Sequence, residues 1–428
     1  MFAGCKLMAY KIEQLKNGVC VVANPMKERK SVSIGIWAHV GGRNETPKES
    51  GISHFLEHLV FKGTKTRTAN QIKEAVEGVG GSLNAFTGEE YTAFVARIAS
   101  RHFPQVFEVL AEMVLDASLK KEDVNKERTV IMEEIKMTQD QPSQLADELL
   151  GELVWPKHAL GRPLAGTLET VGAINEKHLS DYRDRYYHGN RISIVAAGNI
   201  HQKALVKISN TYFSKNAKGQ PAPTETFRER QTEPQLKLHY KKTEQTHLAM
   251  ALHALPRGHE DEYALELLNV ALGGNMSSRL FNEVREERGL AYDIGSFTRK
   301  YNETGVFGVS AGVDHGKINE ALSVILKELE KTAREAVRAD ELRRAKEFYI
   351  GQLQLGLESS MSHMLWMGEQ LVTQGRCTTA EEIVRKVEKV TAADIKRIAQ
   401  KIFKTRAINL AVVGPIESDK QLQKQLQF

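Results

Sequence analysis

The sequence predicts an α+β protein of two homologous domains, each a mixed, mainly antiparallel sheet packed with helices. The first observation is an internal repeat: residues 32–45 are echoed by 247–260, and residues 191–200 are echoed by 407–416. The copies are offset by 215 residues (Glu45 to Glu260) and by 216 residues (Gly198 to Gly414), about half of the 428 residues. Halves of this size suit two domains.

The second observation is the pattern inside each half. Every repeated stretch is an apolar, β-branched run that ends at a turn residue, which predicts a buried strand. Longer stretches with helical periodicity, such as 103–115 and 319–333, lie between these strands and predict helices that back a sheet.

A polar segment separates the halves. Residues 214–234 contain three prolines and a glycine and have no apolar periodicity, which is typical of an interdomain linker. We therefore expect one domain over residues 1–213 and another over 235–428.

Composition narrows the class of protein. The chain is 41% hydrophobic and 26% charged, as expected of a soluble globular protein. A net charge of +5, with basic and acidic residues mixed, does not favour a nucleic-acid partner. No apolar run approaches the ~18–20 residues of a membrane span, and residues 1–10 lack the apolar stretch of a secretory signal. Cys5, Cys20 and Cys377 fit a reducing compartment, so we expect a cytoplasmic protein.

The pentapeptide at 54–58, His-Phe-Leu-Glu-His, carries the strongest functional signal. On a helix, His54 and His58 stand one turn apart, and Glu57 falls within the same third of the circumference. Two neutral imidazoles so placed can bind zinc, and the carboxylate can take a proton from a zinc-bound water. This order, His-x-x-Glu-His, is the reverse of the commoner His-Glu-x-x-His and is the signature of the inverzincins. The alternative is a helix that carries two histidines by chance.

A third ligand is expected in the helical run 125–137. Glu127 and Glu134 are seven residues apart and return to nearly the same helix face, whereas Glu133 points about 100° away. One of the aligned pair could ligate zinc while the other orients a histidine. These residues alone leave open which does which.

The run 54–64, His-Phe-Leu-Glu-His-Leu-Val-Phe-Lys-Gly-Thr, and the later Glu-Arg-x-Val-Ile-x-Glu-Glu at 127–134 resemble the pitrilysin (insulinase) family of zinc peptidases. The resemblance covers essentially the whole chain. It is closest to the half-length subfamily of the mitochondrial processing peptidase β subunit and its bacterial relatives. In that pattern the third ligand lies 76 residues beyond the second histidine, which selects Glu134. Glu127 matches the accessory glutamate of the family.

The resemblance also assigns roles to the two halves. Full-length members enclose substrate between two two-domain halves, so this chain is expected to form half of a clamshell. Shifting the zinc positions by 215 gives Asn269, Leu272 and Gly273, none of which suits zinc. We therefore expect 1–213 to be the zinc-bearing catalytic domain and 235–428 a degenerate repeat.

Two further segments indicate how substrate is held. Residues 80–87 alternate apolar and polar side chains from Leu83 onward and could form an edge strand that pairs with an extended peptide. They resemble the substrate-binding edge strand of the family, here Leu83, Asn84, Ala85 and Phe86, in which the residue matching Asn84 can bond the scissile carbonyl region. An ordinary hairpin strand is the alternative.

In the second half, Arg285 and Tyr292 are similar to the Arg-x6-Tyr pair of the family, which reaches toward the zinc. Such a pair could bond a peptide carbonyl or polarise the oxygen that becomes an anion. Gln144 and Glu148 stand where the processing peptidase has two acids for a basic substrate residue, so a strict arginine preference is not expected.

The predicted function is that of a Zn2+-dependent endopeptidase acting on extended peptides or unfolded segments. His54, His58 and Glu134 hold zinc, and Glu57 acts as base and then as acid. The alternatives are a non-catalytic family subunit that serves as scaffold or substrate-presenting partner, and a zinc amidase or esterase for small molecules. Because one chain carries both the zinc residues and the Arg/Tyr pair, we expect a homodimer.

Overall fold

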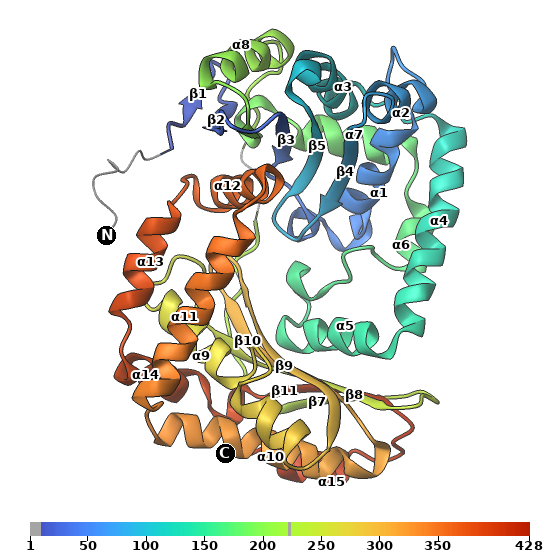
Figure 1. Cartoon of the computed structure of the whole chain (residues 1–428). Helices are drawn as coiled ribbons and strands as arrows, with labels where there is room; N and C mark the ends of the chain where they lie inside the picture. Colours follow the sequence, from blue (N-terminus) through green and yellow to red (C-terminus); the bar gives the residue numbers. More distant parts are fainter. Residues whose placement is uncertain (1–9, 221–223) are drawn as a thin grey trace. The chain divides into compact units, whose positions relative to one another are not determined.

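The computed structural model describes residues 10–220 and 224–428, which form two compact units. The first unit takes in the described residues up to Ile135, Pro163–Glu225 and Gln354–Glu382. The second takes in Lys136–Arg162, Thr226–Leu353 and Ile383–Phe428. Each unit therefore contains a segment from the other half of the sequence (Figure 1).

Within the described residues, the first unit contains a six-stranded sheet in the order β1-β2-β6-β3-β5-β4. Strands β2 and β6 are parallel, and the other neighbours are antiparallel. Buried side chains of β3 and β5 face a core covered by α3, whose inward stripe includes Val106, Phe107 and Leu110. The strands are β1 (Glu13–Gln14), β2 (Cys20–Pro25), β3 (Ser31–Ala38), β4 (Ser82–Thr87), β5 (Thr92–Ala99) and β6 (Ile192–Gly198).

The helices of this part of the chain come from both halves of the sequence. Helix α12 packs on β3 and β6, and its Met364, Met367 and Leu371 lie in one apolar cluster with Trp37. The helices are α1 (Ile52–Leu59), α2 (Ala69–Glu77), α3 (Phe103–Asp116), α4 (Lys121–Asp140), α6 (Leu168–Ala173), α7 (Glu176–Tyr186), α8 (Gln202–Phe213) and α12 (Ser360–Gln374). The end of α4, from Lys136 onward, belongs to the second unit.

The second unit repeats the plan with a sheet of five described strands in the order β7-β11-β8-β10-β9. Its parallel pair, β7 and β11, corresponds to β2 and β6 of the first sheet. The strands are β7 (Gln235–Tyr240), β8 (Thr246–Ala254), β9 (Ala291–Lys300), β10 (Gly305–Val313) and β11 (Asn409–Gly414).

Helix α5 (Pro142–Val154) comes from the first half of the sequence but packs on β8 and β11 of this second sheet. Leu145, Leu149 and Leu150 share an apolar cluster with Ala249 and Ala411. The remaining helices are α9 (Glu262–Leu272), α10 (Ile318–Arg334), α11 (Ala339–Gly356), α13 (Ala380–Lys389), α14 (Ala392–Ile402) and α15 (Lys420–Gln425).

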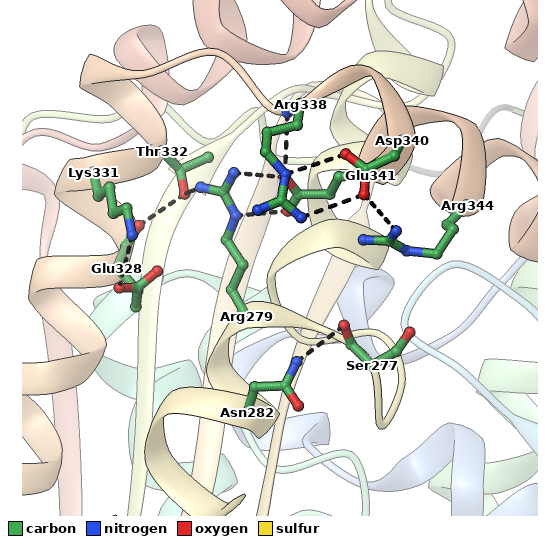
Figure 2. A network of polar contacts seen from close by, with 10 residues as sticks. All are labelled: Ser277, Arg279, Asn282, Glu328, Lys331, Thr332, Arg338, Asp340, Glu341 and Arg344. Carbon is green, nitrogen blue, oxygen red and sulfur yellow. Dashed lines mark hydrogen bonds and ion pairs between the residues drawn. The ribbon is translucent and has the colours of Figure 1, made fainter. Parts of the chain in front are cut away.

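A polar network ties three segments of the second unit together (Figure 2). Arg279 donates two hydrogen bonds to the Glu341 carboxylate, at 2.6 and 2.8 Å, and a third to the Thr332 hydroxyl at 2.9 Å. Arg338 and Arg344 both bind Asp340. Because the Arg279–Glu341 pair is bidentate and largely buried, it holds the segment before β9 to α10 and α11.

The structure confirms the predicted α+β class with two mixed, mainly antiparallel sheets. The repeated stretches form β3 with β8, and β6 with β11. Residues 214–220 and 224–234 form no helix or strand, while Pro221 and Pro223 of the predicted linker and the start of the chain, including Cys5, lie outside the described residues. The predicted domain limits, 1–213 and 235–428, stay a prediction. None of the described helices has the length and apolar character to span a membrane.

Candidate metal centre

The pentapeptide at 54–58 lies on α1, as the spacing predicts. Ile52, Phe55, Leu56 and Leu59 of this helix are buried, which fixes the face it turns to the core. The two histidines and Glu57 share the opposite, partly exposed face. Burial of the apolar stripe therefore presents the three polar side chains together.

The two imidazole rings face a single carboxylate. Their centroids are 4.6 Å apart, and Oε2 of Glu134 on α4 lies 3.8 Å from Nε2 of His54 and 3.5 Å from Nε2 of His58. One ligand atom from each residue lies within 4.8 Å of the others, and no other such group was found among the described residues. Two imidazole nitrogens and one carboxylate match the protein donor set of a catalytic zinc site.

The environment of His54 favours its neutral form, which is the form that binds a metal. Burial, with a smaller contribution from the neighbouring His58, lowers the pKa of His54 to about 4. His54 is therefore neutral near pH 7 and keeps a lone pair for a metal. Its Nδ1 is buried and has no hydrogen-bond partner among the described residues.

Glu127 is placed behind the second histidine. Its buried carboxylate lies 3.1 Å from Nδ1 of His58 and also pairs with Lys62. A carboxylate at Nδ1 holds the proton on that nitrogen and directs the Nε2 lone pair toward Glu134. Glu133 is exposed on α4 and takes no part in the cluster.

Glu57 lies at the same face and contacts the edge strand. The Thr87 hydroxyl, at the end of β4, donates to Glu57 Oε2 at 3.4 Å. Burial raises the pKa of Glu57, against a lowering by His58. A carboxylate whose pKa is raised accepts and holds a proton more readily, as a general base requires.

Strand β4 is the edge of the first sheet. Gly88 donates to the Tyr91 carbonyl at the hairpin turn, and bonded pairs alternate along an antiparallel ladder. The N–H and C=O groups of Leu83, Ala85 and Thr87 therefore point away from β5. Asn84 Oδ1 accepts the Ala85 N–H at 2.9 Å, which agrees with this assignment. The predicted strand is thus an edge strand, beside α1.

Arg285 and Tyr292 lie in the second unit and contact each other. Arg285 is in the π-helical turn Phe281–Glu286, and its guanidinium lies 4.7 Å from the Phe281 ring and 5.0 Å from the Tyr292 ring. Tyr292 is the second residue of β9 and is 74% exposed. Stacking between two rings orients the guanidinium. The action of the pair on substrate stays a prediction.

Gln144 and Glu148 lie on α5 at a pocket of about 540 Å³ in the second unit. Asp147, Asp293 and His247 also line it. Burial, reinforced by the nearby Glu152 and Asp147, raises the pKa of Glu148 to about 7. Several carboxylates therefore line this pocket. Of the two positions that the sequence analysis singled out, Glu148 carries a carboxylate and Gln144 an amide.

Comparison with known proteins shows the family of this chain. Residues 20–168 match the insulinase family (peptidase family M16), and residues 173–349 match the M16 inactive domain. An uncharacterized zinc protease of Streptomyces coelicolor is 36% identical over 96% of this chain and 90% of its own length. One of Bacillus subtilis is 37% identical over 94% and 97%. The chain belongs to the M16 peptidase family.

The fold is also that of M16 proteins. A crystal structure of a Helicobacter pylori protease has a TM-score of 0.90 at 23% identity and covers 95% of this chain and 99% of that one. An M16 inactive domain from Pseudomonas fluorescens has a TM-score of 0.89 at 16% identity, with 96% and 99% covered. The family matches confirm the predicted family, and the His54–His58–Glu134 group lies outside the residues that match the M16 inactive domain.

The sequence analysis did not identify three residues that contact Glu127, Glu57 or the start of α1. Lys62 neutralises Glu127, Thr87 bonds Glu57, and Glu45 bonds the start of α1. Lys62 follows His58 by four residues, a spacing that could have drawn attention to it. Thr87 and Glu45 have no comparable spacing to the motif at 54–58.

Proposed function

We propose that this M16 protein is a zinc-dependent endopeptidase that cleaves extended peptides or unfolded polypeptide segments. The observation that carries the proposal is the convergence of His54, His58 and Glu134 on one point, with Glu57 on the same helix face. The names of the curated relatives support zinc as the metal. When bound, zinc supplies Lewis acidity to this site.

The residues of the chain divide the remaining work. Glu57 accepts a proton from the attacking water and later donates it to the leaving amine. Glu127 holds the tautomer of His58 through Nδ1. The raised pKa of Glu57 supports its role, since a carboxylate with an ordinary pKa would release the proton too readily.

Strand β4 supplies the substrate-binding edge in this proposal. An extended peptide that pairs with the outward groups of Leu83 and Ala85 is bound through its main chain, so affinity depends little on its side chains. Such a peptide must displace Asn84 Oδ1 from the Ala85 N–H, which leaves the Asn84 amide available to a substrate carbonyl. Extended peptides and unfolded segments suit this edge better than compact folded proteins, because only an extended chain can add to a sheet edge.

The test begins with the purified protein. We expect about one zinc per chain and cleavage of an unstructured peptide mixture, with cleavage lost on chelation and restored by zinc. Mass spectrometry of the products then gives the cleavage preference. A protein that binds zinc and a partner but leaves peptides intact is a scaffold, and hydrolysis of small amides or esters alone indicates a small-molecule hydrolase.

We also propose that the chain is a homodimer in which Arg285 and Tyr292 act on the bound peptide, as the family resemblance implies. Mixing Glu57→Gln chains with Arg285→Ala chains tests both points if subunits exchange. Restored cleavage means that the pair acts on the partner's zinc site, and no restoration means that it acts within its own chain. A fully active monomer in sedimentation contradicts the dimer.

A further inference from the structure

The start of α1 is held by a residue far outside the helix. Gly51, which precedes the first helical residue, has a φ of 92° and no side chain with which to cap the helix. An added Cβ there would lie 2.5 Å from the Ala165 carbonyl oxygen, so only glycine fits. The first N–H groups of α1 therefore need a partner from elsewhere in the chain.

Glu45 is that partner. Its Oε2 accepts the Gly51 N–H and its Oε1 accepts the Ser53 N–H, both at 2.8 Å. Glu45 is only 6% exposed, so these hydrogen bonds are shielded from water. A carboxylate at a helix N-terminus also interacts favourably with the helix dipole. Glu45 thus does from six residues away what an adjacent Ser or Asp does in most helices.

The segment that carries Glu45 is itself fixed to the β4–β5 hairpin. Gly42 and Arg43 donate their N–H groups to the carbonyls of Gly88 and Glu89, at 3.2 and 2.8 Å. The Arg43 side chain forms a buried ion pair with Glu90. Glu45 therefore links α1, which carries the metal donors, to the hairpin that contains the proposed substrate edge.

Helix α1 depends on such links because it is only eight residues long. Helices of this length are not stable on their own in water. His54 is the third helical residue and lies in the first turn, the part that frays when a cap is lost. A change at the start of α1 therefore moves His54 relative to His58 and Glu134.

We propose that Glu45 is a positioning residue of the metal centre: by capping α1 it fixes His54 in the geometry that binds zinc. This inference rests on the proposed function for the identity of the metal, but not on peptide cleavage. A neighbouring acid provides a matched control, since Glu49 lies in the same segment and pairs with Thr46 and Arg185 rather than with α1.

The experiment compares Glu45→Gln with Glu49→Gln. An amide can accept only one of the two N–H groups, so we expect Glu45→Gln to weaken zinc binding at least tenfold in a chelator competition. The absorption spectrum of the cobalt-substituted protein should change as well, because it reports ligand geometry. Glu49→Gln removes the same charge and should alter neither. Val109→Ala, a core change in α3, controls for lost stability and should leave the spectrum unchanged.

A folded Glu45→Gln protein with wild-type zinc affinity and cobalt spectrum would overturn the proposal. If that variant does not fold, Glu45→Asp replaces it: its carboxylate is one methylene short, so hydrogen exchange at residues 51–59 should speed up and zinc binding weaken severalfold. Unchanged exchange and affinity in Glu45→Asp would overturn the proposal equally. If the wild-type protein binds no zinc, the peptidase proposal fails, while exchange at 51–59 still tests the cap.

Discussion

In each of the two sheets a helix lies beside the edge strand. The two helices differ in the side chains that they place there. In the first unit α1 lies beside β4 and carries His54 and His58. In the second unit α9 lies beside β9, and a shift of 215 residues replaces the histidines by Asn269 and Gly273.

In the second unit these two residues close part of the β9 edge. The Gly273 carbonyl accepts the Ser296 N–H at 3.1 Å, and Asn269 accepts the Ser296 hydroxyl at both its backbone and side-chain oxygens. A Cβ on Gly273 would lie 2.5 Å from the Ser296 nitrogen. Residues 215 positions apart in the sequence therefore provide candidate metal donors in one repeat and protect a sheet edge in the other.

The largest expected effect is that of Glu57→Gln, which removes the base from the half that keeps the histidines. Cleavage should fall by about 10²–10⁴-fold, because an amide cannot accept the proton. Zinc content should stay at the wild-type level. Glu133→Gln, an exposed acid on α4, is the control and should cleave normally. Undiminished cleavage by the pure Glu57→Gln protein would remove the proposed mechanism.

Alanine at His58 and alanine at Gly273, the corresponding positions of the two repeats, should have opposite effects on zinc content. His58→Ala should lose zinc, because it removes one of the three candidate donors. Gly273→Ala should keep zinc and lower the free energy of unfolding by about 1–3 kcal/mol, because the new methyl group crowds the β9 backbone. Zinc analysis and urea unfolding measure both.

Gly351→Ala, a helix position with nothing within 4 Å of an added Cβ, is the control for the glycine change. Its stability should match or slightly exceed that of the wild type. A Gly273→Ala protein as stable as this control would contradict the difference between the two edges.

A third prediction tests whether only the β4 edge binds peptide. Ala85→Pro removes an N–H that points away from β5, so it leaves the hydrogen bonds between β4 and β5 intact. We expect KM to rise about fivefold, because one lost hydrogen bond to the peptide costs about 1 kcal/mol. Ser296→Ala alters the β9 edge and should leave KM unchanged. Equal effects of both substitutions would mean that the two edges do not differ in substrate binding.

The smallest effect concerns α5, the first-half helix in the second unit. Because burial raises the pKa of Glu148 to about 7 from 4.5, the folded state binds more protons than the unfolded state between these values. Stability linked to Glu148 is therefore present below about pH 4.5 and is lost as the pH rises through about 7.

Glu148→Gln removes this ionisation. Its Tm should exceed that of the wild type by about 2 °C at pH 8, with the gap narrowing toward pH 5. Thermal unfolding followed by circular dichroism at both pH values measures the gap. A gap that is constant with pH would show that Glu148 titrates normally.

Features that depend on short sequence separation could be predicted from the chain itself. The period of apolar residues placed α3, α4 and α10 correctly, because a helix face repeats every three to four residues. The repeated apolar, β-branched runs that end at turn residues predicted β3, β6, β8 and β11, because a strand buried on both faces has a continuous apolar sequence. The pentapeptide placed His54, Glu57 and His58 on one face because a single helical turn determines their spacing.

Features that depend on chain folding required the tertiary structure. The residues alone did not distinguish Glu127 from Glu134, whereas the structure brings Glu134 toward both Nε2 atoms and Glu127 toward Nδ1 of His58. Neither the exchange of α5 and α12 between the repeats nor the cap that Glu45 provides leaves a local pattern. These contacts join residues whose neighbourhood exists only after the chain has folded, so no periodicity or motif records them.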